Sequence, residues 1–172
     1  DAYGRSKYEA EKALRALEDD SFTVSIVRTP LVYGDGVRAN MKSIVSLVRR
    51  SYILPFKDIR NKRNFTSAEN LVAFLDRIIE LRASGTFIAM DKEAISTSDL
   101  VKMISENLGK KIYLFKTPGF LITLGMKVVP SFFDRLYGSY EMDNSETLRL
   151  LDFNPPLTTK EGIKRMIESF PK

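Results

Sequence analysis

Hydrophobic and polar positions along the chain follow two periods, one typical of helices and one typical of strands. Apolar residues recur every three to four positions in five segments, which predicts helices there. These segments are residues 3–18, 41–50, 68–81, 97–108 and 159–170. Shorter runs rich in β-branched and aromatic residues predict strands at 22–28, 85–90 and 111–115. Because helices and strands alternate, the sequence predicts an α/β fold rather than a sandwich or a helical bundle.

Residues typical of helix ends support these boundaries. Ser96 and Thr158 each stand three positions before an acidic residue, which is the pattern of a capping box. Gly109 is expected to close the helix over 97–108, and Asn40 to cap the helix over 41–50. The helix over 68–81 is expected to place four apolar side chains on one side: Leu71, Leu75, Ile78 and Ile79.

Three further segments break the two periods. Residues 29–36 hold a proline and two glycines, which predicts a turn. Residues 53–65 predict a loop, with a cluster of basic side chains that ends at Arg63. Residues 118–133 are the most apolar stretch, but they fall short of the roughly 20 apolar residues that cross a bilayer. They predict a helix that is buried or faces another subunit, with a membrane-surface contact as the alternative.

The composition excludes several classes of chemistry. The 172 residues suffice for one packed domain and include no cysteine and no histidine. Disulfides, Cys/His zinc sites and histidine-based triads are therefore excluded, and acid/base chemistry falls to carboxylates, lysines or the seven tyrosines. A net charge of +5 permits an anionic ligand, but the charge gathers largely in one loop and does not indicate nucleic acid. The lack of cysteine is consistent with a reducing compartment, and we expect a cytoplasmic location.

A tyrosine beside a lysine is the pair best suited to act as a base. A free phenol has a pKa of about 10, and a nearby cation lowers it. A lysine four positions later on a helix lies on the same face. The chain has this spacing twice, at Tyr3 with Lys7 and at Tyr8 with Lys12. Only Tyr3 is followed by a glycine, which leaves room for a ligand, so we interpret the second pair as an ordinary exposed one.

The residues around the first pair carry a family pattern. Tyr-Gly-x-Ser-Lys with a glutamate four positions beyond the lysine is met at Tyr3, Gly4, Ser6, Lys7 and Glu11. The pattern resembles the active-site helix of the extended short-chain dehydrogenase/reductase family. This family contains NAD-dependent nucleotide-sugar epimerases such as UDP-glucose 4-epimerases, together with dehydratases and reductases.

Further segments resemble the same family in the same order along the chain. Residues 28–36 are similar to its Arg-x-x-x-Val-Tyr-Gly-x-Gly segment, and residues 38–41 to the stretch whose asparagine faces the sugar nucleotide. Residues 61–71 resemble its arginine and Asp-Asn-Leu elements, and residues 151–162 its Leu-Gly-Trp-x-Pro ending. Asp152 and Phe153 depart from that ending, for which we expect a change of packing. No second arginine stands at 139–143, so the sequence assigns no second phosphate contact there.

The resemblance implies roles for the candidate residues on the cofactor side. Tyr3 would take a proton from a sugar hydroxyl while a hydride passes to NAD or NADP. Lys7 would lower the pKa of Tyr3 and bind the nicotinamide ribose. Pro30 and its neighbours would line the nicotinamide.

On the substrate side, the resemblance implies a UDP-sugar. Asn40 would face the sugar nucleotide. Arg63, with support from Arg38 and Lys62, would neutralise the diphosphate, a role that suits guanidinium geometry.

The resemblance also implies that residues 1–172 are the C-terminal portion of a longer enzyme. They would supply the last elements of a Rossmann-like parallel sheet and a small α/β substrate-binding lobe, while the N-terminal dinucleotide-binding half is absent. We therefore expect the chain alone to be inactive, not to bind NAD(H), and to form a homodimer or to self-associate.

The reaction stays open at this stage. An epimerase or a C4 keto-reductase acting on a UDP-hexose is favoured. The alternatives are an NDP-sugar 4,6-dehydratase and a non-catalytic nucleotide-binding or scaffold module of the same fold.

Overall fold

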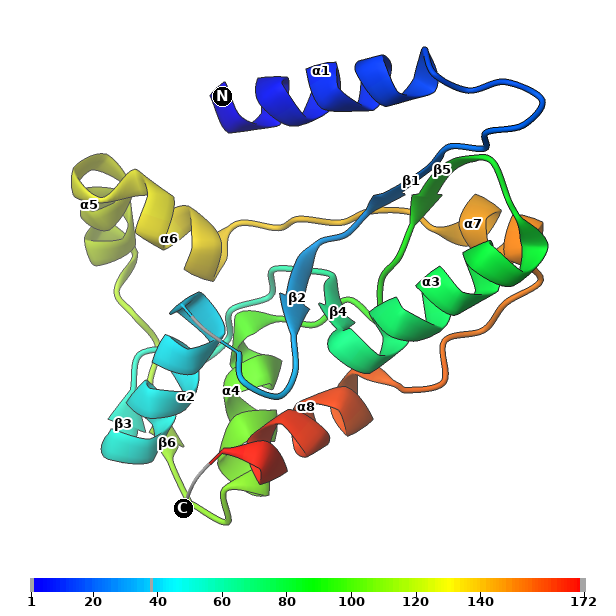
Figure 1. Cartoon of the computed structure of the whole chain (residues 1–172). Coiled ribbons are helices and arrows are strands. Elements are labelled where there is room, and N and C mark those ends of the chain that lie inside the picture. The colour runs from blue at the N-terminus through cyan, green and yellow to red at the C-terminus, as the bar shows by residue number, and fades with distance from the viewer. Residues whose placement is uncertain (1, 38, 171–172) are drawn as a thin grey trace.

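The computed structural model describes residues 2–37 and 39–170, without the side chains of residues 39, 40 and 132 (Figure 1). The helices are α1 (Ala2–Arg15), α2 (Ala39–Arg50), α3 (Ala68–Leu81), α4 (Thr97–Asn107), α5 (Gly119–Val128), α6 (Pro130–Tyr137), α7 (Ser145–Leu151) and α8 (Thr159–Ser169). The strands are β1 (Ser25–Arg28), β2 (Leu31–Tyr33), β3 (Ile53–Leu54), β4 (Phe65–Ser67), β5 (Gly85–Ile88) and β6 (Tyr113–Leu114).

The strands pair in twos, and each pair is parallel. β1 pairs with β5, β2 with β4, and β3 with β6. Parallel neighbours need a crossover between them, which the intervening helices supply. The predicted α/β class with a parallel arrangement is therefore confirmed. The pairs β1–β5 and β2–β4 lie near the middle of the molecule, while β3 and β6 lie at one edge (Figure 1).

The predicted elements are found, and the sequence missed three short strands, β2, β3 and β4. β2 lies inside the predicted turn at 29–36, and β3 and the first residue of β4 lie inside the predicted loop at 53–65. Strands of two or three residues are too short to show a period, so only pairing with a partner reveals them. α2 begins at Ala39, so the prediction that Asn40 caps this helix is wrong.

Two apolar clusters form the core. The larger joins α2, α4 and α8 around fully buried Val45, Val101 and Ile163. The smaller lies under α3, where Phe74 and Ile78 are buried. The predicted apolar face of α3 is therefore partly wrong. Leu75 and Ile79 are exposed, because the sheet and α7 lie on the side of Phe74.

The most apolar stretch of the sequence forms a hairpin of α5 and α6 at the periphery (Figure 1). Pro130 at the start of α6 separates the two helices. α5 has no buried residue, so burial, one of the outcomes that we expected for residues 118–133, is wrong. Within the described residues, no helix has both the length and the apolar character that crossing a membrane requires.

A buried carboxylate joins the central elements. The Tyr33 hydroxyl donates to Oδ2 of Asp91 at 2.6 Å and lies 3.2 Å from the carbonyl oxygen of Thr159. The other oxygen, Oδ1, accepts from the backbone N–H of Ser67 at 2.9 Å and from Nδ2 of Asn70 at 2.7 Å. The carboxylate thus links the ends of β2 and β4 with helix α3, and the Tyr33 hydroxyl connects this cluster to the start of α8.

Burial controls the charge state of this cluster. Desolvation raises the pKa of Asp91, although hydrogen bonds from Tyr33, Ser67 and Asn70 act against the rise. Burial and the Asp91 carboxylate raise the pKa of Tyr33 as well. The Tyr33 phenol therefore stays protonated at neutral pH and cannot be the base of a reaction.

Two motif positions are explained by the backbone around this cluster. A Cβ on Gly162 of α8 would collide with the Tyr33 hydroxyl, so the close approach of α8 requires a residue without a side chain. Asp152 ends α7 in the left-handed region, at φ 43° and ψ 57°. Asp152 therefore adopts the left-handed conformation at the position where the family has a glycine. Phe153, which replaces the family's tryptophan, packs against Phe74 with ring centroids 4.7 Å apart.

We predict that Tyr33→Phe destabilises the fold. The change removes the donor to Asp91 and leaves a buried acceptor unsatisfied, which costs about 1–3 kcal/mol. Urea denaturation measures the free energy of unfolding. Tyr113→Phe is the matched control, because Tyr113 is 65% exposed, and its change is expected to stay within about 0.5 kcal/mol. Equal effects of the two variants would contradict the role of the buried hydroxyl.

We also predict a pH-dependent difference between the wild type and Asp91→Asn. The pKa of Asp91 is raised above its ordinary value of 3.8, so its contribution to stability is fully present below that pH and falls as the pH rises through the folded-state pKa. The wild type should therefore lose stability relative to Asp91→Asn as the pH rises. Asp143→Asn should show the opposite trend, because hydrogen bonds with Ser145 lower the pKa of Asp143. Unfolding free energies across the acid range measure both trends.

Candidate functional site

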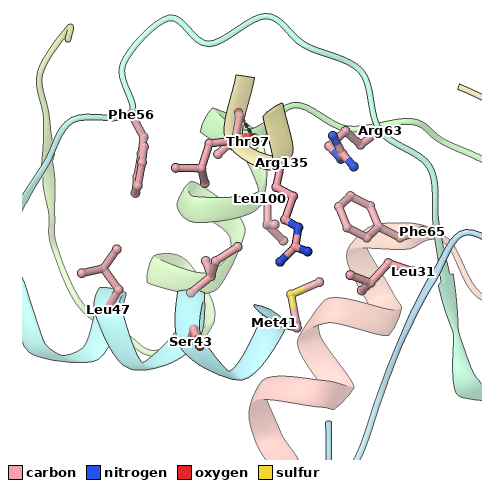
Figure 2. A pocket seen from close by; sticks show the side chains of 12 residues that line it. Leu31, Met41, Ser43, Leu47, Phe56, Arg63, Phe65, Thr97, Leu100 and Arg135 are labelled. Atoms are coloured by element: carbon pink, nitrogen blue, oxygen red, sulfur yellow. Dashed lines mark hydrogen bonds between the residues drawn. The ribbon is translucent and has the colours of Figure 1, made fainter. Parts of the chain in front are cut away.

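A cavity of about 480 Å³ lies between α2, α4 and α6, and we call it the main cavity (Figure 2). Its size is within the range of small-molecule sites. Most of its wall is apolar, and two guanidinium groups, those of Arg63 and Arg135, reach it from different elements. The other lining residues are Leu31, Met41, Ser43, Ile44, Leu47, Phe56, Phe65, Thr97, Leu100 and Leu136.

Arg63 is held by the backbone on both sides. It forms isolated bridges with Ile95 and with Tyr140. Its Nη1 donates to the carbonyl oxygen of Gly138 at 2.9 Å and to that of Asp134 at 3.2 Å. These contacts lie at the C-terminal end of α6 and aim the guanidinium along the wall of the main cavity. Arg63 thus lines the main cavity, and its contact with a diphosphate stays a prediction.

Arg135 is a cavity residue that the sequence analysis missed. It lies on α6, and Figure 2 shows its guanidinium pointing into the main cavity toward Met41. The sequence search for a second arginine covered residues 139–143, whereas this one precedes them. A basic residue in a short apolar helix gives no motif, so only the docking of α6 brings Arg135 to the cavity that Arg63 also lines.

Buried amide contacts set the position of α6. Nδ2 of Asn61 donates to the carbonyl oxygen of Gly138 at 3.0 Å and to that of Leu136 at 3.3 Å. Oδ1 of Asn61 accepts from the backbone N–H of Thr97 at 2.9 Å, and the Thr97 hydroxyl donates to Leu136 at 2.7 Å. Asn61 therefore ties the end of α6 to the start of α4, and this contact places Arg135.

A smaller cleft of about 240 Å³ adjoins the main cavity, and we call it the Pro30 cleft. Pro30 is buried in the link between β1 and β2. Leu31, Arg63 and Phe65 line both spaces, so the two are neighbours across the Arg63 side chain. The remaining lining residues of the cleft are Thr29, Asn64 and Tyr140.

Tyr3 and Lys7 lie on α1, away from both spaces. Lys7 Nζ is 5.6 Å from the centre of the Tyr3 ring, and Tyr3 is 71% exposed. Tyr8 and Lys12 have the same arrangement at 5.5 Å, so local geometry does not separate the two pairs. Neither Tyr3 nor Lys7 lines the main cavity or the Pro30 cleft. Their catalytic assignment therefore remains a prediction.

Polar contacts attach α1 to the rest of the chain. Nε and Nη2 of Arg28 donate to the two carboxylate oxygens of Glu11, at 3.0 and 2.5 Å. This hydrogen-bonded pairing with Arg28 lowers the pKa of Glu11. Arg15 donates to the Thr86 hydroxyl at the other end of the helix. Glu11 and Arg28 belong to two separate sequence motifs, and the structure shows that these motifs meet.

Within the described part of the chain, the other predicted substrate-binding residues are not seen in the main cavity. Arg38 and the side chain of Asn40 lie outside the described residues, although Met41 beside them lines the main cavity. Lys62 pairs with Glu141 at 3.8 Å on the surface and does not line that cavity.

Comparison with known proteins places the chain in a family. Residues 1–168 match the RmlD substrate binding domain. The chain belongs to the RmlD substrate binding domain family. It is 37% identical over 176 residues to a UDP-glucose 4-epimerase of Vibrio cholerae, covering 99% of this chain and 54% of that relative. The match agrees with the predicted resemblance to nucleotide-sugar epimerases and reductases of the short-chain dehydrogenase/reductase type.

Solved structures of such enzymes share the fold of this family member. A UDP-glucuronic acid 4-epimerase of Bacillus cereus in complex with NAD superposes with a TM-score of 0.70 at 18% identity, covering 98% of this chain and 52% of that one. A dTDP-4-dehydrorhamnose reductase of Bacillus anthracis in complex with NADP gives a TM-score of 0.70 at 20% identity, with coverages of 98% and 55%. The chain thus spans about half the length of the relatives that it matches.

Proposed function

We propose that this chain is the C-terminal, substrate-binding portion of an NAD- or NADP-dependent enzyme that epimerises a UDP-hexose or reduces it at C4. The observation that carries the proposal is the pair of arginines in the main cavity, next to the Pro30 cleft. The 37% identity to a UDP-glucose 4-epimerase supports it. In the absence of its N-terminal half, the chain would be inactive.

The main cavity suits a nucleotide diphosphate sugar. Arg63 and Arg135 would hold the diphosphate, since guanidinium groups bind phosphate oxygens in a bidentate manner. The apolar walls from α2 and α4 would contact the less polar parts of the ligand. Arg38 and Asn40 would add contacts from the start of α2. Arg135 thereby supplies the second phosphate contact that the sequence search did not find.

The Pro30 cleft suits the nicotinamide end of the cofactor. Pro30 follows the carboxyl end of β1, and ligands of open α/β sheets bind beyond the carboxyl ends of the strands. The cofactor would supply hydride transfer at the sugar carbon. Tyr3 would hold and release the hydroxyl proton, and Lys7 would stabilise the ionised phenol and bind the ribose.

The family resemblance implies that most of the residues that distinguish these reactions lie upstream of this chain. Relatives of both kinds, a 4-epimerase and a reductase, share the fold, and a 4,6-dehydratase remains an alternative. A non-catalytic nucleotide-binding or scaffold module is the other alternative, which the presence of Tyr3 and Lys7 disfavours. We further propose a cytoplasmic protein that forms a homodimer and does not bind nucleic acid.

We predict that Tyr3→Phe abolishes activity in the full-length protein. Removing the phenolic hydroxyl removes the proton acceptor, and the turnover number should fall by at least about a hundredfold. Conversion of UDP-glucose and NAD binding are measured together. Tyr8→Phe is the matched control and should keep full activity. Unchanged turnover of Tyr3→Phe, or an equal loss in Tyr8→Phe, would overturn the catalytic assignment.

We predict that Arg135→Ala weakens the binding of UDP to this chain. Loss of one charge-assisted contact to a phosphate should lower the affinity about tenfold or more. Titration calorimetry with UDP measures the change. Lys62→Ala removes the same charge outside the main cavity and should leave the affinity within about twofold. Equal effects of the two changes would indicate a general charge effect and contradict the assigned site.

A further inference from the structure

The hairpin of α5 and α6 carries an apolar surface that the described part of the chain leaves uncovered. Phe120 and Val128 of α5 are 71% and 69% exposed. We call the exposed apolar side chains of this segment the hairpin surface: Phe120, Leu121, Leu124, Met126, Val128 and Val129. Contiguous exposed apolar surface of this kind marks an interaction site.

Close packing and hydrogen bonds fix the position of the hairpin in the fold. A Cβ on Gly125 would overlap the ring of Phe133, so the two helices pack at a distance that only glycine permits. The Tyr137 hydroxyl donates to Thr117 at 3.0 Å, and the Thr117 hydroxyl donates to the carbonyl oxygen of Pro55 at 2.7 Å. These contacts hold the hairpin against the loop after β3.

A groove of about 550 Å³ extends the hairpin surface toward β3 and β6. Phe115, Leu121 and Leu124 line it, and Thr117 provides the hydroxyl described above. Alternating side chains of a strand share a face, so Tyr113 lies on the same side of β6 as Phe115. Tyr113 pairs with Ile53, and these two are 65% and 61% exposed. The groove therefore leads from the hairpin toward β3 and β6, on which these two exposed side chains lie.

Lysines occur along the segments that form this apolar surface. Lys127 lies in the last turn of α5, and Lys116 directly follows Phe115 of the groove. Lys57 joins them, because its backbone N–H donates to the carbonyl oxygen of Phe115 at 3.1 Å. A small cleft beside Ile122 of α5 is lined by Lys57, Arg60 and Lys116, with Asp58 as its one acidic residue.

We propose that the hairpin surface docks on an anionic lipid bilayer. The ten residues of α5 measure about 15 Å, half of the roughly 30 Å hydrocarbon thickness, so the helix would lie in the interface rather than span it. Its aliphatic and aromatic side chains would enter the headgroup region. Lys57, Lys116 and Lys127 would contact lipid phosphates.

Two other occupants fit less well. A small soluble ligand needs polar groups to orient it, whereas the one side-chain hydroxyl of the groove, that of Thr117, is engaged with Pro55 and Tyr137. A second copy related by a two-fold axis would bring the same patch against itself and place its basic residues close together. An anionic bilayer would bury the apolar side chains and would also pair the lysines with lipid phosphates.

Flotation with vesicles tests the proposal on this chain and on the full-length protein. Vesicles of phosphatidylcholine with phosphatidylglycerol should bind the protein, and vesicles of phosphatidylcholine alone should bind it more weakly. The double variant Phe120→Glu/Val128→Glu should lower the bound fraction about tenfold. Val72→Glu/Ile79→Glu on α3 is the matched control. It makes the same charge change at residues that are 55% and 71% exposed, and it should keep most of the binding.

Five results would overturn the proposal. The first is a lack of flotation with anionic vesicles, and the second is equal binding to the two vesicle types. The third is an equal loss of binding in the two double variants. The fourth is flotation of the chain but not of the full-length protein, which would show that other parts of the protein cover the hairpin. If sedimentation without lipid shows a dimer that Phe120→Glu/Val128→Glu dissociates, the surface belongs to a second copy and the proposal fails.

Discussion

The buried carboxylate of Asp91 is the contact on which the central architecture depends. It receives hydrogen bonds from Tyr33, Ser67 and Asn70, which belong to β2, β4 and α3. A buried carboxylate is costly unless its oxygens are satisfied, so these three elements can meet only in this arrangement. Asn70 extends the network to the C-terminal segment through two hydrogen bonds with the backbone of Leu157. The family motifs that contain Tyr33 and Asn70 therefore hold elements of the fold together.

Hydrogen bonds of a buried polar side chain also set the shape of the main cavity. Asn61 fixes the end of α6 against α4, and Arg63 donates to carbonyl oxygens of the same helix end. α6 thus stays in place although little of it is buried, and Arg135 lines the same cavity as Arg63. Backbone and amide contacts position α6, and the two arginine side chains place positive charge at the main cavity.

Much of the fold could be predicted because the spacing of apolar residues in a long amphipathic segment indicates its secondary structure. Helices α3, α4 and α8 begin where Ser67, Ser96 and Thr158 accept a hydrogen bond from the third residue that follows, and two of these caps were predicted. The strands β2, β3 and β4 were missed because two or three residues show no period. The buried face of α3 was partly mistaken because Phe74 and Ile79 are both apolar, and only the position of the sheet and of α7 selects between them.

The sequence by itself determined the class of fold, the exclusion of histidine and cysteine chemistry, and the family, since these depend on local periods, composition and the order of motifs. It also named Arg63 as a candidate contact for phosphate, a role that stays a prediction. The tertiary structure alone decided that Arg135 shares the cavity of Arg63, that Tyr33 is a buried hydrogen-bond donor, and that the most apolar segment is exposed. Each of these depends on contacts between residues far apart in the chain, and such contacts leave no periodic or local pattern.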